Sequence, residues 1–318
     1  MAAERLPWPC RKREPASTSW DHNSAVGGRP QYLFPTGAQF GRDNLVLHAR
    51  ARQHRVDGFA GPLSIKTVVR GVVNWNAGGR DLAVDPASFL VLNAGEEYSM
   101  DLDAPHPVET ACVFFRHGFV ERHVLDATTP VEVSLDDPER AAPGLPWVSR
   151  LHSDLDGGIV HSVQSLAERC ERELQPSGFE EAFLVLADKL LRLYREVRAQ
   201  MSRLPAQKAS TREEVFRRLQ RGREYLHSEW NGTVSLESTA RHACLSRYHF
   251  HRAFTQAFGK TPHRYVTEVR LARAHGLLRS GKSVTETCMD VGFTSAASFS
   301  RLFRAMYGAN PSAVRKAS

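Results

Sequence analysis

The stretch SRYHFHRAFTQAFGKTP, Ser246 to Pro262, carries two kinds of side chain on opposite sides of one predicted helix. Phe250, Phe254 and Phe258 recur every four residues, which places them on one helical face. Polar side chains with long reach occupy the opposite face near the start of the helix: Arg247, Tyr248, His251 and Arg252. The pattern predicts a helix that packs its aromatic face inside the protein and leaves its polar face free to bind a partner.

The same scaffold occurs a second time in the last third of the chain. FHRAFTQAFGKTP (250–262) aligns with FSRLFRAMYGANP (299–311) at an offset of 49, and LESTARHACLS (236–246) aligns with VTETCMDVGFT (284–294) at an offset of 48. This alignment pairs Ser246 with Thr294 as helix N-caps. It puts the one extra residue of the second copy between the cap and the first aromatic residue.

Each copy has the order of a helix-turn-helix: a short helix, a tight turn, a Ser or Thr cap, and a longer helix ended by Gly and Pro. A small residue, Ala240 or Cys288, lets the two helices cross closely. A turn residue, Cys244 or Gly292, must adopt an unusual backbone angle. The predicted connecting helix, Pro262 to Arg279, is about 27 Å long at 1.5 Å per residue. That length could bring the two second helices near the roughly 34 Å separation of successive major grooves.

These motifs resemble those of the AraC/XylS family of bacterial transcription regulators over about 100 residues. The resemblance rests on Gly259-Lys260-Thr261-Pro262, on R-x-x-x-A-x-x-L-L from Arg270 to Leu278, and on Gly292-Phe293 followed by S-F-S-R-L-F from Ser298 to Phe303. It implies a sequence-specific protein that binds double-stranded DNA. Such proteins are commonly activators that work with RNA polymerase, and their N-terminal domain senses a small molecule or forms a homodimer.

This sequence departs from the family pattern in two places. Cys244 stands at a turn position often held by Gly, and the second recognition helix begins with small residues that offer little hydrogen bonding. The predicted DNA-binding residues are Arg247, Tyr248, His251 and Arg252 in the first motif, and Ser295, Ala296, Ala297, Ser300, Arg301 and Arg304 in the second. We expect the first motif to carry more of the base readout and the second to contact mainly phosphates. For Arg252, an ion pair with the connecting helix is the alternative.

Charge and length favour two domains. A chain of 318 residues exceeds one ordinary core. Residues 211–318 contain 18 basic and 8 acidic side chains, whereas the remainder contains 24 and 27. The basic excess in the last third is typical of a module that binds a polyanion, although a solvated basic surface would give the same count.

The predicted organisation has four parts. Residues 1–30 form a mobile arm, 31–200 an effector-sensing or dimerisation domain, 201–211 a linker, and 212–318 the DNA-binding domain, whose first helix is capped by Thr211. Within the second part, short β-branched runs over about 31–135 predict antiparallel strands, and helices follow over about 158–200. The stripes Ile159, Val163, Leu166, Cys170, Leu174 and Phe183, Leu186, Leu190, Leu193, Val197 pack within this domain or pair in a dimer.

Turns are predicted at Gly78-Gly79, Asp85-Pro86, Asn93-Ala94-Gly95 and Ala104-Pro105. By resemblance, the strands would form a cupin-like barrel, with Trp75 on a strand and Tyr98 in a turn as candidate effector-binding residues or as ordinary core aromatics. The histidines of a metal-dependent cupin are missing from these positions. The sequence therefore predicts no metal, no cofactor and no enzyme. The alternatives are a cupin-type enzyme with a DNA-binding appendage, and a regulator whose N-terminal domain only dimerises.

Five scattered cysteines without a C-x-x-C pair favour a reducing cytoplasm over a disulfide framework. Basic residues at the N-terminus precede no apolar run, which argues against a signal peptide. No stretch approaches the roughly 20 apolar residues of a membrane span. The sequence itself names neither the effector nor the operator, and it does not distinguish an activator from a repressor.

Overall fold

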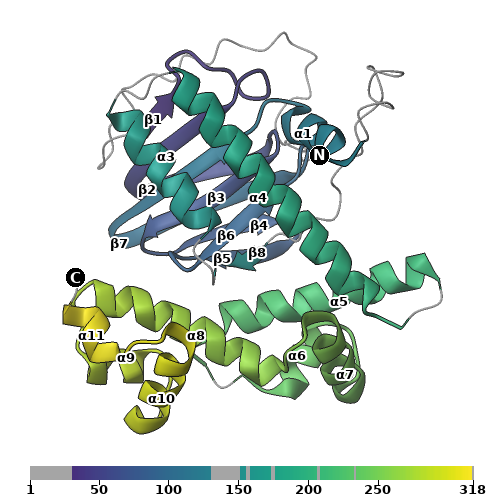
Figure 1. Ribbon diagram of the computed structural model, residues 1–318, viewed down its shortest axis with the longest axis vertical. Coiled ribbons are helices and arrows are strands. Elements are labelled where there is room, and N and C mark those ends of the chain that lie inside the picture. Colours follow the sequence, from purple (N-terminus) through teal and green to yellow (C-terminus); the bar gives the residue numbers. More distant parts are fainter. Residues whose placement is uncertain are drawn as a thin grey trace, which may run out of the picture.

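The computed structural model describes residues 31–129, 151–154, 158–172, 176–205, 208–232 and 234–316. Strands make up most of the first part, helices make up the last part, and the long helix α4 (Pro176–Ser202) runs from one to the other (Figure 1). This arrangement confirms the predicted fold class, a mainly β N-terminal barrel with helices, followed by an all-α part with two helix-turn-helix motifs. The predicted arm, residues 1–30, lies outside the described residues.

The N-terminal part is one antiparallel sheet. Its strands are β1 (Gln31–Phe34), β2 (Leu45–Ala60), β3 (Ser64–Arg70), β4 (Val73–Ala77), β5 (Arg80–Val84), β6 (Ser88–Leu92), β7 (Glu97–Phe114) and β8 (Leu151–Ser153). The order is β1-β2-β7-β3-β6-β8, with β4 pairing both β5 and β7. One half of β7 pairs with β3 and the other half with β4, and register shifts bend β2 against β7. The sheet therefore curls into a nearly closed barrel.

Three of the four predicted turns separate strands, and the fourth prediction is wrong. Gly78-Gly79 joins β4 to β5, Asp85-Pro86 joins β5 to β6, and the residues around Gly95 join β6 to β7. Ala104-Pro105 lies inside β7, where the pairing with β2 is interrupted between Asp103 and Val108. Proline cannot donate to a strand ladder, so here it marks an irregularity within one long strand.

Two helices cover the outer face of the sheet, as Figure 1 shows for α3 (Ile159–Glu171) and α4. The predicted stripes pack here: Val163, Leu166, Phe183, Leu186 and Leu190 are buried against Ile65 and Val113 of the sheet. This supports packing within the domain, except for Val197 of the second stripe, which packs with the C-terminal helices. Leu174 lies outside the described residues. Pro176-Ser177-Gly178 forms the first turn of α4, and an additional helix, α1 (Phe119–Thr128), occupies part of the range expected to be strand.

The other end of α4 packs with the C-terminal helices, because Val197 and Met201 belong to the same apolar cluster as Phe250 and Phe254. These helices are α5 (Ala209–Ser228), α6 (Leu236–His242), α7 (Arg247–Phe258), α8 (Pro262–Arg279), α9 (Val284–Asp290), α10 (Ala296–Tyr307) and α11 (Pro311–Lys316).

Helix α5 begins earlier than predicted. Its N-cap is Lys208, whose carbonyl accepts from Arg212 N–H at 3.1 Å, so Thr211 lies in the first turn and is not the cap. The described residues between α4 and α5, 203–205 and 208, fall within the predicted linker. Among the described helices, none combines the length and the hydropathy needed to cross a bilayer.

The apolar face of α7 packs on α5 through one close approach. A Cβ at Gly222 of α5 would stand 2.4 Å from Cε2 of Phe250, whose side chain is fully buried. No other residue type fits without moving this ring or its surroundings. The first motif therefore depends on Gly222 for more than backbone freedom.

We expect Gly222→Ala to lower the free energy of unfolding. Overpacking of this kind costs about 1–3 kcal/mol, which outweighs the roughly 1 kcal/mol that Ala gains over Gly within a helix. Gly276→Ala is the matched control, since a Cβ at this position in α8 meets no atom within 4 Å. It should raise stability by about 0.5–1 kcal/mol. Urea unfolding of both variants measures the difference, and equal effects would contradict the packing argument.

Candidate nucleic-acid interface

The first helix-turn-helix is held by caps at both ends of its second helix. Ser246 Oγ accepts from His249 N–H at 3.3 Å, and Gly259 ends α7 in the left-handed conformation, at φ 67°. In the turn, Leu245 N–H donates to Ala240 O at 2.9 Å. Cys244 has a φ of 51°, the one positive value of a non-glycine residue in the described part of the chain. The predicted unusual backbone angle at this position is confirmed.

The second motif repeats this construction. Gly292 has a φ of 74°, Phe293 N–H donates to Cys288 O at 3.0 Å, and Gly308 ends α10. The cap is Ser295, whose Oγ accepts from Ser298 N–H at 3.3 Å, so the predicted cap at Thr294 is wrong. A capping hydroxyl must stand immediately before its helix to reach the N–H of the third helical residue. The extra residue of the second copy therefore precedes the cap.

Helix α7 presents the four polar residues predicted for the first motif on one face. Arg247, Tyr248, His251 and Arg252 are all exposed, and 76% of the surface of Tyr248 is accessible. The opposite face carries the buried aromatic side chains. Within the residues that the structure describes, Arg252 forms no ion pair with α8, so its alternative role lacks support.

Helix α10 presents a different surface. Ser295, Ala296 and Ala297 are exposed at its start, Arg301 and Arg304 are exposed further along, and Ser300 is half-buried. Small side chains at the N-terminal end allow close approach to a groove but offer few hydrogen bonds. Two guanidinium groups along the helix suit phosphate oxygens.

Arg270 of α8 fixes the second motif to the rest of the domain, a role that the sequence reading assigned to no residue. Its guanidinium donates to the carbonyl oxygens of Trp230 at 2.7 Å, Gly292 at 3.0 Å and Gly232 at 3.2 Å. Desolvation lowers the pKa of Arg270 from its usual range. One side chain thereby ties the turn between α9 and α10 to the loop between α5 and α6.

The barrel interior brings the two candidate effector residues into one cluster. Trp75 of β4 and Tyr98 are both buried there, and Tyr98 belongs to β7 instead of the predicted turn. Lys66, which the sequence analysis missed, lies beside Tyr98 and is fully buried. Its Nζ donates to Tyr98 Oη at 3.1 Å and lies 3.5 Å from the ring centroid of Phe114. The apolar residues on both sides of this lysine in LSIKTVV were the sequence signal that could have indicated its burial.

Lys66 is unusual because the described residues supply no carboxylate to pair with it. Desolvation lowers its pKa to about 7, and burial raises the pKa of Tyr98. A buried amine without an anionic partner costs free energy wherever it is charged.

The described residues contain no cluster of three or more His, Cys, Asp or Glu side chains arranged to hold a metal ion. His48 of β2 lies between two carboxylates, with Nε2 3.0 Å from Glu109 Oε1 and Nδ1 against Glu171. These contacts join the sheet to α3.

Comparison with known proteins supports the reading of the C-terminal part. Residues 239–317 match the model of a helix-turn-helix domain family. The HTH-type transcriptional activator RhaS of Escherichia fergusonii is 38% identical over 93 residues, which cover 29% of this chain and 34% of RhaS. The chain thus matches about a third of the length of this relative. The HTH-type regulator YbfI of Bacillus subtilis is 23% identical over 215 residues, covering 68% of this chain and 70% of YbfI.

Two solved structures are also similar. A probable AraC family transcriptional regulator from Rhodopseudomonas palustris is 27% identical and covers 32% of this chain and 96% of its own, with a TM-score of 0.31. ToxT from Vibrio cholerae is 10% identical and covers 86% of this chain and 97% of its own, with a TM-score of 0.34.

The buried amine of Lys66 should make stability depend on pH. Its folded-state pKa of about 7 lies below the unfolded value of 10.5, so above pH 7 the unfolded state binds more protons and the free energy of unfolding rises with pH. Between pH 7 and 9 this residue should raise the free energy of unfolding by about 2 kcal/mol.

Lys66→Met should remove that rise and be more stable than the wild type at pH 7. The exposed Lys208→Met is the control and should keep the wild-type pH dependence. Urea unfolding of the wild type and both variants at pH 7 and pH 9 measures this pH dependence. A wild type and a Lys66→Met variant with the same pH dependence would contradict a buried amine.

Proposed function

Residues 239–317 match a helix-turn-helix domain family, and from this premise we propose that the protein is an AraC-type transcriptional regulator that binds double-stranded DNA at specific sequences. The observation that carries the proposal is the repetition of one capped motif on both sides of α8, with each second helix exposing its outer face. A single polypeptide would then read a bipartite site with α7 and α10 in successive major grooves.

The two recognition helices divide the work of binding. Arg247 and Arg252 can bond guanine edges bidentately, and Tyr248 and His251 can reach bases or phosphates. In α10, Ala296 and Ala297 make only apolar contacts, for instance with thymine methyl groups, while Arg301 and Arg304 neutralise phosphates. The excess of basic over acidic residues in the last third supports this assignment.

The barrel is the proposed sensor of a small-molecule effector. Tyr98 shares an apolar cluster with Trp75 and bonds to Lys66 in its interior, where aromatic rings and one amine would hold a small ligand. RhaS is named as an activator, and ToxT has been solved with an unsaturated fatty acid bound. We propose that this protein activates transcription through RNA polymerase, with the homodimer as its active form and the bacterial cytoplasm as its location. A ligand that prefers one state of the barrel would shift its thermal stability and its affinity for DNA.

Selection of bound DNA from a random pool by the full-length chain tests the central claim. We expect enrichment of a bipartite motif whose two halves are separated by about one helical turn of DNA. The better-defined half should be the one that α7 reads. A pool that shows no enrichment over successive rounds would reject sequence-specific binding.

Single substitutions in the two helices should have different effects. Arg252→Ala should relax base preference at one position, with a loss of about 1–3 kcal/mol of discrimination. Arg304→Ala should weaken binding to all sequences alike and reduce the salt dependence by about one phosphate contact. Titrations of selected and mutated sites at several salt concentrations measure both effects. If both variants lose affinity uniformly across sequences, the division of work is wrong.

A further inference from the structure

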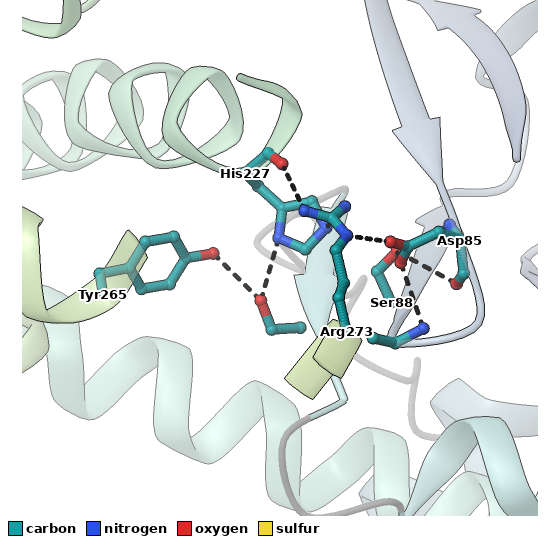
Figure 2. A network of polar contacts seen from close by, with 7 residues as sticks. Asp85, Ser88, His227, Tyr265 and Arg273 are labelled. Atoms are coloured by element: carbon teal, nitrogen blue, oxygen red, sulfur yellow. Dashed lines mark hydrogen bonds and ion pairs between the residues drawn. The ribbon is translucent and has the colours of Figure 1, made fainter. Parts of the chain in front are cut away.

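A buried ion pair joins the barrel to the helix between the two motifs. Arg273 of α8 donates from Nε to Asp85 in the turn between β5 and β6, and the exposed fractions of the two side chains are only 8% and 7% (Figure 2). Asp85 also accepts from Ser88 Oγ at 2.7 Å and from Ala87 N–H at 3.1 Å. The carboxylate is therefore held in place by its own turn before it meets the guanidinium.

His227 of α5 extends this network. Its Nε2 lies 3.4 Å from Arg273 Nη2, and its Nδ1 lies 3.1 Å from Ser153 Oγ of β8. Burial lowers the pKa of His227 to about 3, so the imidazole is neutral, accepts from Arg273 and donates to Ser153. Ser153 Oγ also lies 3.2 Å from Tyr265 Oη of α8. Figure 2 shows His227 between Tyr265 on one side and Asp85 with Arg273 on the other.

Two further contacts strengthen the same interface. Arg80 of β5 pairs with the buried Glu224 of α5, and Arg223 Nη2 donates to Leu151 O of β8 at 2.7 Å. The barrel thus reaches α5 and α8 from two separate segments, β5 with the turn that follows it, and β8. Figure 1 shows α5 and α8 next to the sheet and α10 farther from it. The exposed faces of the recognition helices remain uncovered.

The contacts fall on both sides of the junction between the motifs. Tyr265 packs in the apolar cluster of the first motif, against Phe254, whereas Arg273 stands between Leu271 and Ala274, which belong to the cluster of the second motif. Trp230 packs at the edge of both clusters, and the Arg273 guanidinium lies 4.3 Å from its ring centroid. The barrel therefore contacts α8 at Tyr265, which belongs to the first cluster, and at Arg273, which lies beside the second and in turn contacts Trp230.

We propose that the barrel acts as a brace across the two helix-turn-helix motifs, fixing their relative orientation so that the chain accepts only one spacing between the two halves of its DNA site. Arg273 is the positioning residue of this brace. The inference rests on the proposed DNA-binding function. Motifs joined through one helix, apolar contacts and the hydrogen bonds of Arg270 can still bend and twist relative to each other. The barrel, as a rigid third body, reduces the conformational freedom that the motifs must lose when both bind DNA at once.

The test uses the full-length chain and a bipartite site selected from the random pool. Affinity is measured for this site, for sites with a single base pair inserted or deleted between the halves, and for a site with one half scrambled. Asp85→Asn keeps the size of the side chain and removes the charge, which leaves Arg273 buried without its partner. We expect it to weaken binding to the full site about tenfold, to shrink the penalty for altered spacing, and to leave half-site binding unchanged.

Asp188→Asn is the matched control. It makes the same chemical change in an ion pair with His123, at 2.7 Å, that lies entirely within the N-terminal part. This variant should keep the wild-type preference for one spacing. Tyr265→Phe is the second test variant, since it removes the hydroxyl that meets Ser153 and retains the ring packed on Phe254. It should change spacing preference in the same direction by a smaller factor, and it carries the test if Asp85→Asn does not fold.

The outcomes separate the proposals. An unchanged spacing penalty in folded Asp85→Asn or in Tyr265→Phe overturns the brace, and so does a rise in affinity for the full site, which would mark the contact as inhibitory. Equal losses on full and half sites also overturn it, since they indicate general damage. If the wild type selects no specific DNA, the proposed function fails and the brace with it. If it selects a site but the variants keep its spacing preference, only the brace fails.

Discussion

The burial of guanidinium groups along α8 is the constraint on which the arrangement of this protein depends. A guanidinium removed from water must be given acceptors, and α8 carries the buried Arg273 and the partly buried Arg270 within one turn. Arg270 takes three backbone carbonyls from loops of the DNA-binding part, and Arg273 takes a carboxylate from the barrel. Trp230 serves both, because its carbonyl accepts from Arg270 and its ring lies under Arg273. Helix α8, which separates the two motifs, is therefore also the helix that connects the DNA-binding part to the barrel.

The helical part could be predicted closely from the sequence because its signals are local. Caps, glycines at helix ends and aromatic residues every four positions each act within one or two turns, and the bounds of α7 and α10 follow from them. The errors were of the same local kind. Thr294 and Ser295 are adjacent hydroxyl residues, and only the hydrogen bond to Ser298 N–H distinguishes the cap. Helix α5 begins without any side-chain cap, so its start left no sequence signal.

The N-terminal part and the interface between the parts were predictable only in outline. Alternation identified strands, but the length of β7 and its three partners are set by pairing across the sheet. Asp85 and Arg273 are 188 residues apart, and no sequence pattern around either residue predicts their ion pair. Asp85 was read correctly as a turn residue, yet its second role follows from which helix packs beside that turn. For the candidate DNA contacts, the sequence predicted which side chains are exposed, whereas their roles at bases and phosphates remain predictions.

Cys244 shows how the first motif tolerates a departure from the usual turn. A non-glycine residue in the left-handed region costs about 1–2 kcal/mol, and the equivalent residue in the second motif, Gly292, avoids that cost. The surrounding contacts hold the turn in this conformation: Leu245 N–H bonds to Ala240 O, and Arg218 Nη1 donates to Cys244 O at 3.3 Å. At Gly292 a side chain would also be crowded, since a Cβ would stand 3.2 Å from the Arg270 guanidinium carbon. A side chain at the second turn would crowd the guanidinium that donates to Gly292 O, whereas the first turn carries a side chain while its carbonyl accepts from Arg218.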